Sequence, residues 1–202
     1  MINFQLPAEL KNRYFAFRHG ESEANTEGII ISNPETGIYE YGLSSNGRKQ
    51  VQNSIENSIL PDSDTKIYSS DFKRAVETAE IIKSILNVSE INISHLLRER
   101  FFGEFEKTSN KNYDKVWSED RKNPDHNLWK VESVNSVLSR TSELIITLES
   151  RFSNMNIILV SHGDALQILQ TFFLQTEAAR HRDVEHLETA ELRLLNRQKA
   201  SV

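Results

Sequence analysis

Short apolar runs alternate along the chain with longer segments in which apolar residues recur at helical spacing. Strands are predicted at 13–18, 66–70, 91–94, 156–161 and 189–195. Helices are predicted at 43–60, 71–86 and 134–152, and directly after residues 162–164. The run at 156–161 is the most apolar and is therefore expected at the centre of the sheet. This alternation predicts the α/β class, with a mostly parallel central sheet.

Capping and turn residues mark the ends of several elements. Ser44 is suited to be the N-cap of the helix that runs to about Leu60, and Pro61-Asp62 is expected to end that helix. Residues 29–41 are rich in turn formers and predict a loop, whose isoleucines pack beneath it or line a pocket.

Residues 98–130 differ in character from the rest of the chain. Aromatic side chains are scattered there among many charged ones, which is typical of an insertion over the sheet edge rather than a core unit. Trp117 and Trp129 are interpreted as packing residues of this insertion. The lysine-rich stretch 107–115 is interpreted as a solvated face.

Composition narrows the class of protein. At 202 residues the chain is long enough for one core, so a single domain over 1–202 is expected. A net charge of −5 argues against general affinity for nucleic acid, and the lack of cysteine excludes disulfides and thiolate metal sites. Residues 1–13 do not resemble a signal peptide, and no apolar run could span a bilayer. A cytoplasmic location without membrane contact is therefore expected.

The first strand runs abruptly into Arg18-His19-Gly20, followed by residues suited to the first turn of a helix. In open α/β sheets ligands bind at the carboxyl ends of strands, where the next helix presents free N–H groups and the positive end of its dipole. A histidine beside a fixed cation at such a junction indicates a phosphate site.

Three further motifs follow other predicted strands: Arg74-Ala75, Arg98-Glu99-Arg100 and Ser161-His162-Gly163. Because the carboxyl ends of parallel strands meet at one edge, all four motifs are expected to converge there. Three of the seven glycines, Gly20, Gly103 and Gly163, lie within or just after these motifs. They are expected where the backbone closely approaches a ligand.

Taken in order, these motifs make the chain resemble the histidine phosphatase superfamily, which includes cofactor-dependent phosphoglycerate mutases, the bisphosphatase domain that acts on fructose 2,6-bisphosphate and many acid phosphatases. The matching residues are Arg18-His19-Gly20-Glu21-Ser22 with Asn25, Ser69-Ser70-Asp71 with Arg74-Ala75 and Thr78-Ala79, Arg98-Glu99-Arg100 with Gly103, and Ser161-His162-Gly163-Asp164. The resemblance extends from about residue 13 to residue 195. It implies a single three-layer α/β/α domain of the phosphoglycerate mutase-like kind, with an insertion over the active site at about 98–130.

The resemblance also implies roles for individual residues. His19 would be the nucleophile that carries the phosphoryl group as phosphohistidine. Arg18, Arg74 and His162 would hold the phosphate oxygens with positive charge. Asn25 and Gly163 would complete the substrate-binding site. No metal and no cofactor would then be required.

The same resemblance assigns the proton transfers to Glu99. It would protonate the leaving oxygen and later activate water, which requires a raised pKa. Glu104 and Glu106 are rival carboxylates that rank below it, and Glu21 is expected at the helix start or on the surface. An ordinary alternative is that Glu99 forms only a surface ion pair with its neighbouring arginines.

Other residues also have ordinary interpretations. Arg74 taken alone would be a solvated helix residue that pairs with Glu77 or Asp71. Four histidines are interpreted as surface or hydrogen-bonded loop residues: His95, His126, His181 and His186.

Departures from the mutase pattern favour hydrolysis. Mutases of the family have a tyrosine, an arginine pair and a threonine where this chain has Phe102, Arg121-Lys122 and Ile31. Because the mutase residues bind a second anionic group of the substrate, their absence here favours water as the acceptor of the phosphoryl group. The prediction is therefore a metal-independent phosphatase acting on a small phosphorylated metabolite.

Three alternatives stay open. A cofactor-dependent phosphoglycerate mutase is the first, since Lys107, Lys111 or Lys115 could supply other cations. An inactive phosphate-sensing module is the second. A metal hydrolase is the weakest, because the histidines lack i, i+4 spacing. The sequence also allows a homodimer.

Overall fold

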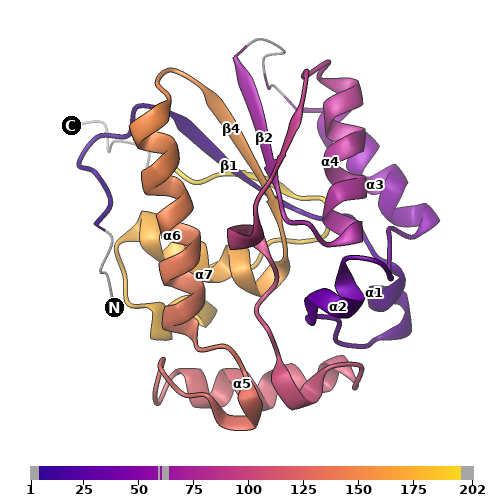
Figure 1. Ribbon diagram of the computed structural model, residues 1–202, viewed down its shortest axis with the longest axis vertical. Helices are drawn as coiled ribbons and strands as arrows, with labels where there is room; N and C mark the ends of the chain where they lie inside the picture. Colours follow the sequence, from indigo (N-terminus) through magenta and orange to yellow (C-terminus); the bar gives the residue numbers. More distant parts are fainter. Residues whose placement is uncertain (1–4, 59, 61–63, 197–202) are drawn as a thin grey trace.

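The computed structural model describes residues 5–58, 60 and 64–196. Its centre is a five-stranded sheet in the order β3-β2-β4-β1-β5 (Figure 1). The strands are β1 (Arg13–Arg18), β2 (Thr65–Ser69), β3 (Ile91–Ile93), β4 (Asn156–Ser161) and β5 (Leu192–Leu194). The first four are parallel to their neighbours, and β5 is antiparallel to β1. The apolar strand β4 lies at the centre, as predicted.

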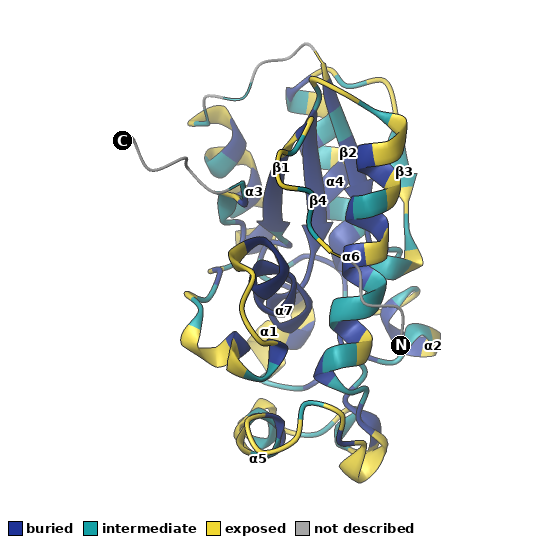
Figure 2. Ribbon diagram, turned by 90° about the vertical axis from the view of Figure 1, so that its left-hand side faces the viewer, coloured by how far each residue is buried: buried dark blue, intermediate teal, exposed yellow. Residues whose placement is uncertain are grey.

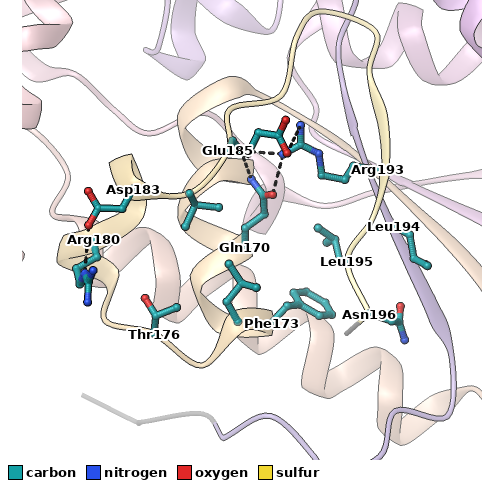
Figure 3. A pocket seen from close by; sticks show the side chains of 12 residues that line it. Gln170, Phe173, Thr176, Arg180, Asp183, Glu185, Arg193, Leu194, Leu195 and Asn196 are labelled. Carbon is teal, nitrogen blue, oxygen red and sulfur yellow. Dashed lines mark hydrogen bonds and ion pairs between the residues drawn. The ribbon is translucent and has the colours of Figure 1, made fainter. Parts of the chain in front are cut away.

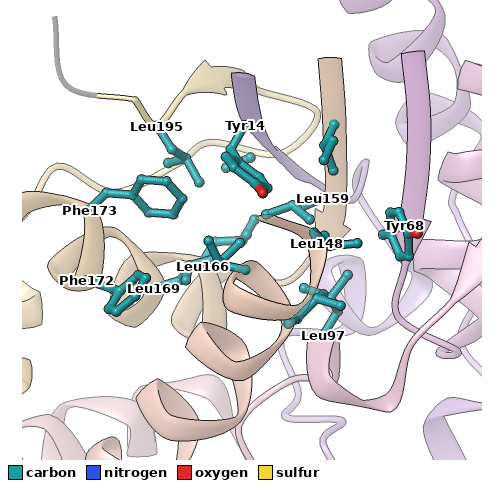
Figure 4. Close-up of a cluster of buried hydrophobic side chains, with 14 of the residues drawn as sticks. Tyr14, Tyr68, Leu97, Leu148, Leu159, Leu166, Leu169, Phe172, Phe173 and Leu195 are labelled. Atoms are coloured by element: carbon teal, nitrogen blue, oxygen red, sulfur yellow. The ribbon is translucent and has the colours of Figure 1, made fainter. Parts of the chain in front are cut away.

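Four long helices cover the sheet. They are α3 (Ser45–Glu56) and α4 (Lys73–Ile85) on one face and α6 (Val134–Arg151) and α7 (Gly163–Leu174) on the other (Figure 1). Since successive strand residues point to opposite faces, Tyr14 and Ala16 pack with α6 and α7, and Phe15 and Phe17 pack with α3 and α4. Figure 4 shows the first of these two cores. The predicted three-layer α/β/α architecture is confirmed.

Hydrogen bonds set the ends of α3. The Ser44 hydroxyl accepts from the Gly47 N–H over 2.9 Å, as expected for an N-cap. The helix ends at Glu56 rather than near Leu60, because the Asn57 side chain donates to the Asn53 carbonyl over 2.7 Å. The predicted stop at Pro61-Asp62 lies outside the described residues.

Short elements fill the connections. They are α1 (Glu23–Glu27), α2 (Pro34–Gly37), α5 (Tyr113–Asp120) and the 3-10 turns His95–Leu97, Gly103–Phe105, Asn110–Asn112, Leu128–Lys130 and Ala178–Asp183. The segment 29–41, predicted as a loop, therefore contains one helical turn. In the part of the chain described, no helix has the length and apolar character needed to cross a membrane.

Candidate active site

The four motifs come together at the carboxyl edge of the sheet. Figure 2 shows β1 and β4 running toward the side of the molecule on which α5 lies. A pocket of about 230 Å³ opens at this edge. It is lined by six of the residues expected from the sequence, Arg18, His19, Asn25, Arg74, Glu99 and Gly163. Residues that are distant in sequence thus face one small space.

His19 lies directly after β1, and its N–H continues the ladder by donating to the Ser161 carbonyl over 3.0 Å. Its ring Nδ1 is 2.7 Å from the Gly20 carbonyl, which can only accept, so Nδ1 carries the proton. The lone pair is therefore on Nε2, which accepts from Arg74 Nε over 3.1 Å. Burial, followed by the charges of Arg74 and Arg18, holds the pKa of His19 well below its ordinary value. The ring is neutral near pH 7.

Arg74, in the first turn of α4, is buried without a carboxylate in hydrogen-bond contact. Besides His19, its guanidinium donates from Nη2 to the Ile31 carbonyl over 3.0 Å. Its Nη1 has no hydrogen-bond partner among the described residues. The alternative of a solvated ion pair is wrong, because Glu77 binds Arg48 and Asp71 binds Arg98. Arg74 thus offers a positive charge, with an N–H group free of partners in the described chain, beside the His19 lone pair.

Arg18 is bound by residues that come much later in the sequence. Its Nη1 donates to His186 Nε2 and to the Leu187 carbonyl, each over 2.7 Å. Its Nε has no partner in the described part of the chain. His186 is thus a hydrogen-bonded loop residue, as the sequence indicated, but it also lines the pocket, which the sequence did not indicate. Nothing local to His186 indicates this position, because it depends on how the chain returns from α7 to β5.

Glu99 is only 9% exposed, so the alternative of a surface ion pair is wrong. Its Oε1 accepts from the Arg100 N–H over 2.8 Å and from the Ala165 N–H, in the first turn of α7, over 3.1 Å. Burial, followed by the charge of Asp164, raises the pKa of Glu99. A general acid requires a pKa that is raised in this way.

The rival carboxylates have other partners. Glu106 Oε2 accepts from the N–H and hydroxyl of Ser32, each over 2.7 Å, and from the Asn33 N–H over 3.0 Å. Glu104 is exposed and lies 3.4 Å from Lys130. Glu21 accepts from the Ser44 hydroxyl over 2.6 Å, as expected at a helix start. None of the three lines the pocket.

His162 lies behind His19 rather than in the pocket wall. It is fully buried, its ring is 5.1 Å from that of His19, and its Nε2 is 2.9 Å from the Ser70 hydroxyl. Burial, followed by the charge of Arg74, holds its pKa well below the ordinary value. Without a bound anion His162 is therefore neutral.

Asn25 lines the pocket, and hydrogen bonds hold its side-chain amide in one orientation. The amide oxygen accepts from the Ser22 N–H and hydroxyl over 3.0 and 2.9 Å. Its NH₂ group is the remaining donor.

At two glycines the backbone lies close to other parts of the chain rather than to a ligand. A Cβ on Gly20 would lie 2.5 Å from the Gly47 carbonyl oxygen, and one on Gly103 would lie 2.0 Å from the Trp129 carbonyl oxygen. The expectation of ligand contact is therefore wrong for these two. Gly163 differs, since it lines the pocket at the N-terminus of α7.

A buried charged cluster fastens α5 to the start of α7. Arg100 binds both oxygens of Asp120 over 2.7 Å and reaches Asp164 over 3.2 Å. His126 and His181 are buried beside these carboxylates, so of the two interpretations given for them, surface residue or hydrogen-bonded loop residue, burial excludes the first. Breaking such a buried pair costs about 3–5 kcal/mol, so the cluster fixes the position of α5.

Residues of the segment 98–130 also line the pocket. They are Asn110, Tyr113 and Trp117, so Trp117 does more than pack the segment. Trp129 does pack, against Phe105 with ring centroids 5.2 Å apart. Phe102, at the position of the mutase tyrosine, is fully buried against Tyr113.

A second hollow of about 540 Å³ lies between the end of α7 and β5 (Figure 3). Arg180 and Asp183 pair with each other there over 3.1 Å, and Arg193 binds the Glu185 carbonyl over 2.7 Å. It contains none of the motif residues. Size alone therefore does not identify the candidate site.

Comparison with known proteins agrees with this arrangement. The chain is 28% identical over 158 residues to phosphoglycerate mutase-like protein 4 of Arabidopsis thaliana, covering 75% of this chain and 66% of that protein. The chain thus spans just under two thirds of the length of that relative. It is 25% identical over 164 residues to a protein of Schizosaccharomyces pombe named as a probable phosphatase, covering 81% and 74%.

Among solved structures, a mycobacterial glucosyl-3-phosphoglycerate phosphatase in complex with VO3 shares the fold. Its TM-score is 0.73 at 21% identity, over 89% of this chain and 90% of that one. The family model of the histidine phosphatase superfamily, branch 1, matches residues 14–201, which include all four motifs. The chain belongs to the histidine phosphatase superfamily.

Proposed function

We propose that this protein is a metal-independent phosphatase that hydrolyses a phosphate monoester through a phosphohistidine on His19. One observation carries the proposal: the Nε2 lone pair of neutral His19 is held beside Arg74, whose Nη1 is buried without a partner in the described residues. A nucleophile next to a positive group with a free N–H donor is what phosphoryl transfer requires, since catalysis there is mostly positioning and charge stabilisation.

Arg18 and Arg74 hold the equatorial phosphate oxygens in this mechanism. Both present guanidinium N–H groups that have no protein partner in the described chain, namely Arg18 Nε and Arg74 Nη1. The Asn25 amide and the N–H groups at Gly163 add neutral donors from the first turns of α1 and α7. The negative charge of the phosphate favours protonation of His162 behind His19, which adds a further positive charge.

Glu99 transfers the protons. In the first half-reaction His19 Nε2 bonds to phosphorus, the bond from phosphorus to the ester oxygen breaks, and Glu99 gives its proton to that oxygen. In the second, water attacks phosphorus, the bond from phosphorus to Nε2 breaks, and Glu99 takes a proton from the water. The raised pKa of Glu99 supports the acid role, and its position in the pocket wall supports both.

Hydrolysis is favoured over mutase activity. Phe102 has no hydroxyl and is buried, Arg121 is paired with Asp183 over 2.5 Å, and Lys122 is paired with Glu119 over 2.7 Å. None of these residues lines the pocket, and neither do Lys107, Lys111 or Lys115. The pocket therefore offers little to retain a product while the phosphoryl group is handed back.

The relatives support a phosphatase in general terms, and the substrate we infer is a small phosphorylated metabolite. The cytoplasmic location and the homodimer stay predictions from the sequence.

The test is acid-quenched trapping of the phosphoenzyme in excess chelator, with release of inorganic phosphate followed in parallel. Wild-type protein is expected to form an acid-labile adduct and to release phosphate, and His19→Ala to do neither. His95→Ala is the matched control, because His95 is exposed beside Asp71 and should react like wild type. Loss of activity in chelator, or an adduct on His19→Ala, would contradict the proposal. Interconversion of 2- and 3-phosphoglycerate would favour the mutase instead.

A further inference from the structure

We propose that Arg140 is a positioning residue for the proton transfers of the site. Its guanidinium, paired with Glu132, binds the backbone at Glu99 and thereby sets where the Glu99 carboxyl lies in the pocket. This inference rests on the proposed function, and it adds a residue that lies outside the pocket.

Glu99 lies on a segment that is not held by regular secondary structure. Residues 98–102 belong to no helix or strand, and they follow the 3-10 turn His95–Leu97. The backbone there has no ladder of hydrogen bonds to fix it, while the carbonyl groups of a largely buried segment need partners. Side chains from other elements must therefore supply those partners.

Arg140, on α6, supplies partners for three carbonyl groups of this stretch. Its Nη1 donates to the Leu96 carbonyl over 2.7 Å and to the Arg98 carbonyl over 2.9 Å. Its Nη2 donates to the Glu99 carbonyl over 3.2 Å. Because the guanidinium is planar and rigid, three bonds to one group fix both the position and the orientation of the chain at Glu99.

Glu132 holds the guanidinium in place. Its Oε1 accepts from Arg140 Nε over 2.9 Å, and its Oε2 accepts from Arg140 Nη2 over 3.0 Å. The side chains of Arg140 and Glu132 are only 17% and 19% exposed, so water and salt screen this two-bond ion pair less than a surface pair. Arg140 thus has a fixed carboxylate partner.

Glu132 also binds the chain on the other side of Glu99. Its N–H donates to the Phe101 carbonyl over 2.8 Å, and its carbonyl accepts from Arg100 Nε over 2.7 Å. Its Oε2 accepts from the Phe101 N–H over 3.3 Å. The Arg140–Glu132 pair therefore binds the chain both before and after Glu99, whose own side chain lines the pocket.

This arrangement matters for proton transfer, because the Glu99 carboxyl must reach the ester oxygen. Its Oε1 accepts from the N–H groups of Arg100 and Ala165, so the carboxyl moves with the backbone of the segment. Proton transfer needs a separation of about 2.6–3.2 Å between the two oxygens. A displacement of roughly 1 Å can lower a rate about 100-fold. Arg140 is therefore expected to affect the step in which the leaving oxygen takes its proton.

Arg140 itself does not act on the substrate. It does not line the pocket, and its Nε, Nη1 and Nη2 all donate to protein oxygens. It differs in this from Arg18 and Arg74, each of which has a nitrogen without a partner in the described chain. A substitution at Arg140 is therefore expected to act through Glu99 and to leave phosphate binding intact.

The test compares two esters in Arg140→Gln, which keeps one side-chain donor but loses the planar fork and the charge. We measure kcat/KM, because it reports the steps up to transfer of the phosphoryl group to His19. For phenyl phosphate we expect a fall of roughly 10- to 100-fold, and for 4-nitrophenyl phosphate, whose leaving group needs little protonation, a fall within about threefold. The inhibition constant of inorganic phosphate should stay within about threefold, which shows that the site is folded. Equal falls for the two esters, or no fall, would overturn the proposal.

Two further variants guard against a loss of folding. Arg140→Lys keeps the charge and should restore part of the kcat/KM for phenyl phosphate. Glu132→Gln leaves Arg140 in place but removes its charged partner, and should cause a smaller fall with the same dependence on the ester.

Arg193→Gln is the matched control. The Arg193 side chain is 18% exposed and also binds a carboxylate and two backbone carbonyls, but at β5. Any fall in kcat/KM should be equal for the two esters. A fall that depends on the ester in this variant would overturn the assignment to the Arg140–Glu132 pair.

A double variant asks whether Arg140 acts through Glu99. In a Glu99→Gln background, Arg140→Gln should lower kcat/KM for phenyl phosphate by no more than about twofold, because the group that Arg140 positions is already gone. A further fall as large as in the wild-type background would show that Arg140 acts on another group, and the proposal would be wrong.

Amide NMR separates this inference from the proposed function. The N–H groups of Arg100 and Ala165 both donate to Glu99 Oε1, so both resonances should shift as Glu99 titrates in wild type and stay in place in Glu99→Gln. In Arg140→Gln at least one of the two shifts should fall to about half or less, because its hydrogen bond lengthens. If wild type turns over no ester, or Glu99→Gln loses equally on both esters, the proposed function fails while this measurement still tests the positioning. Unchanged shifts of both amides in Arg140→Gln would overturn the inference whether or not the protein is an enzyme.

Discussion

Nε of Arg74 donates a hydrogen bond to Nε2 of His19 over 3.1 Å. The bond fixes the plane of the ring and the direction of its Nε2 lone pair, because Nδ1 is already committed to the Gly20 carbonyl. The same guanidinium leaves Nη1 without a partner in the described residues. In the proposed mechanism one arginine therefore both orients the nucleophile and offers charge to the group that it attacks.

The first prediction concerns the shape of this arginine. Arg74→Lys keeps a positive charge but cannot bind His19, the Ile31 carbonyl and a phosphate oxygen together, because an ammonium lacks the planar fork. We expect kcat/KM to fall about 100-fold or more, the usual effect of losing one preorganised donor. Steady-state kinetics with phenyl phosphate measure this fall in kcat/KM. Arg48→Lys, at an exposed ion pair with Glu77, is the control and should leave kcat/KM unchanged.

The second prediction concerns Glu99 and the leaving group. Glu99→Gln cannot donate a proton to the ester oxygen, so kcat/KM for phenyl phosphate is expected to fall about 100-fold or more. For 4-nitrophenyl phosphate, whose leaving group needs little protonation, the fall should be much smaller. Because the free enzyme needs Glu99 protonated, wild-type kcat/KM for phenyl phosphate should decline as pH rises through its raised pKa. The variant should lack this decline, and equal losses for both esters would contradict the acid role.

The third prediction concerns stability and pH. The pKa of His162 is held well below 6.5 in the folded protein by burial and nearby positive charge. Below about pH 6.5 the unfolded chain therefore binds a proton that the folded protein does not, and the free energy of unfolding falls as pH decreases. One such histidine contributes a slope of up to about 1.4 kcal/mol per pH unit. His162→Gln should show a shallower slope in urea unfolding measured between pH 5 and 7. Identical slopes would show that His162 is not the group responsible.

The fourth prediction concerns the packing of the His19 loop on α3. A Cβ on Gly47 would lie 1.9 Å from the backbone carbonyl oxygen of Glu21, two residues after His19. Gly47→Ala is therefore expected to destabilise the protein by about 1–3 kcal/mol, although alanine in a helix usually adds up to about 1 kcal/mol of stability. Activity should fall as well, because relieving the clash displaces the loop.

Gly42→Ala is the matched control for Gly47. A Cβ there would meet the carboxylate of Glu77 at 2.8 Å, which is the movable end of a side chain rather than backbone. Its effect on the urea midpoint and on activity should be smaller. A Gly47→Ala protein that is as stable and active as wild type would contradict the packing argument.

The sequence was sufficient for the framework and for the expectation that the motif residues meet, since six of the expected site residues line one pocket. Strand β4 at 156–161 was predicted with its observed bounds, because four consecutive apolar residues, 157–160, lie at its centre and all six positions are buried. The motif residues could be gathered at one edge because parallel strands leave no other place for their carboxyl ends. Family resemblance then distinguished Glu99 from Glu104 and Glu106, which local spacing alone does not separate.

The rest depended on contacts between segments that are distant in sequence. His186 reaches Arg18 from 168 positions away, and Trp117 is held by Asp164 from 47 positions away. Neither contact leaves a periodic or local signal, since each depends on where a loop crosses the sheet edge. The sequence by itself determined the layers and the edge of the sheet at which the motifs meet, because hydrophobic period and short motifs are local properties, and the phosphate-binding roles of the motif residues stay predictions. Only the tertiary structure decided which side chains line the rest of the pocket, because Asn110, Tyr113 and Trp117 are brought to it by the packing of α5 against α7.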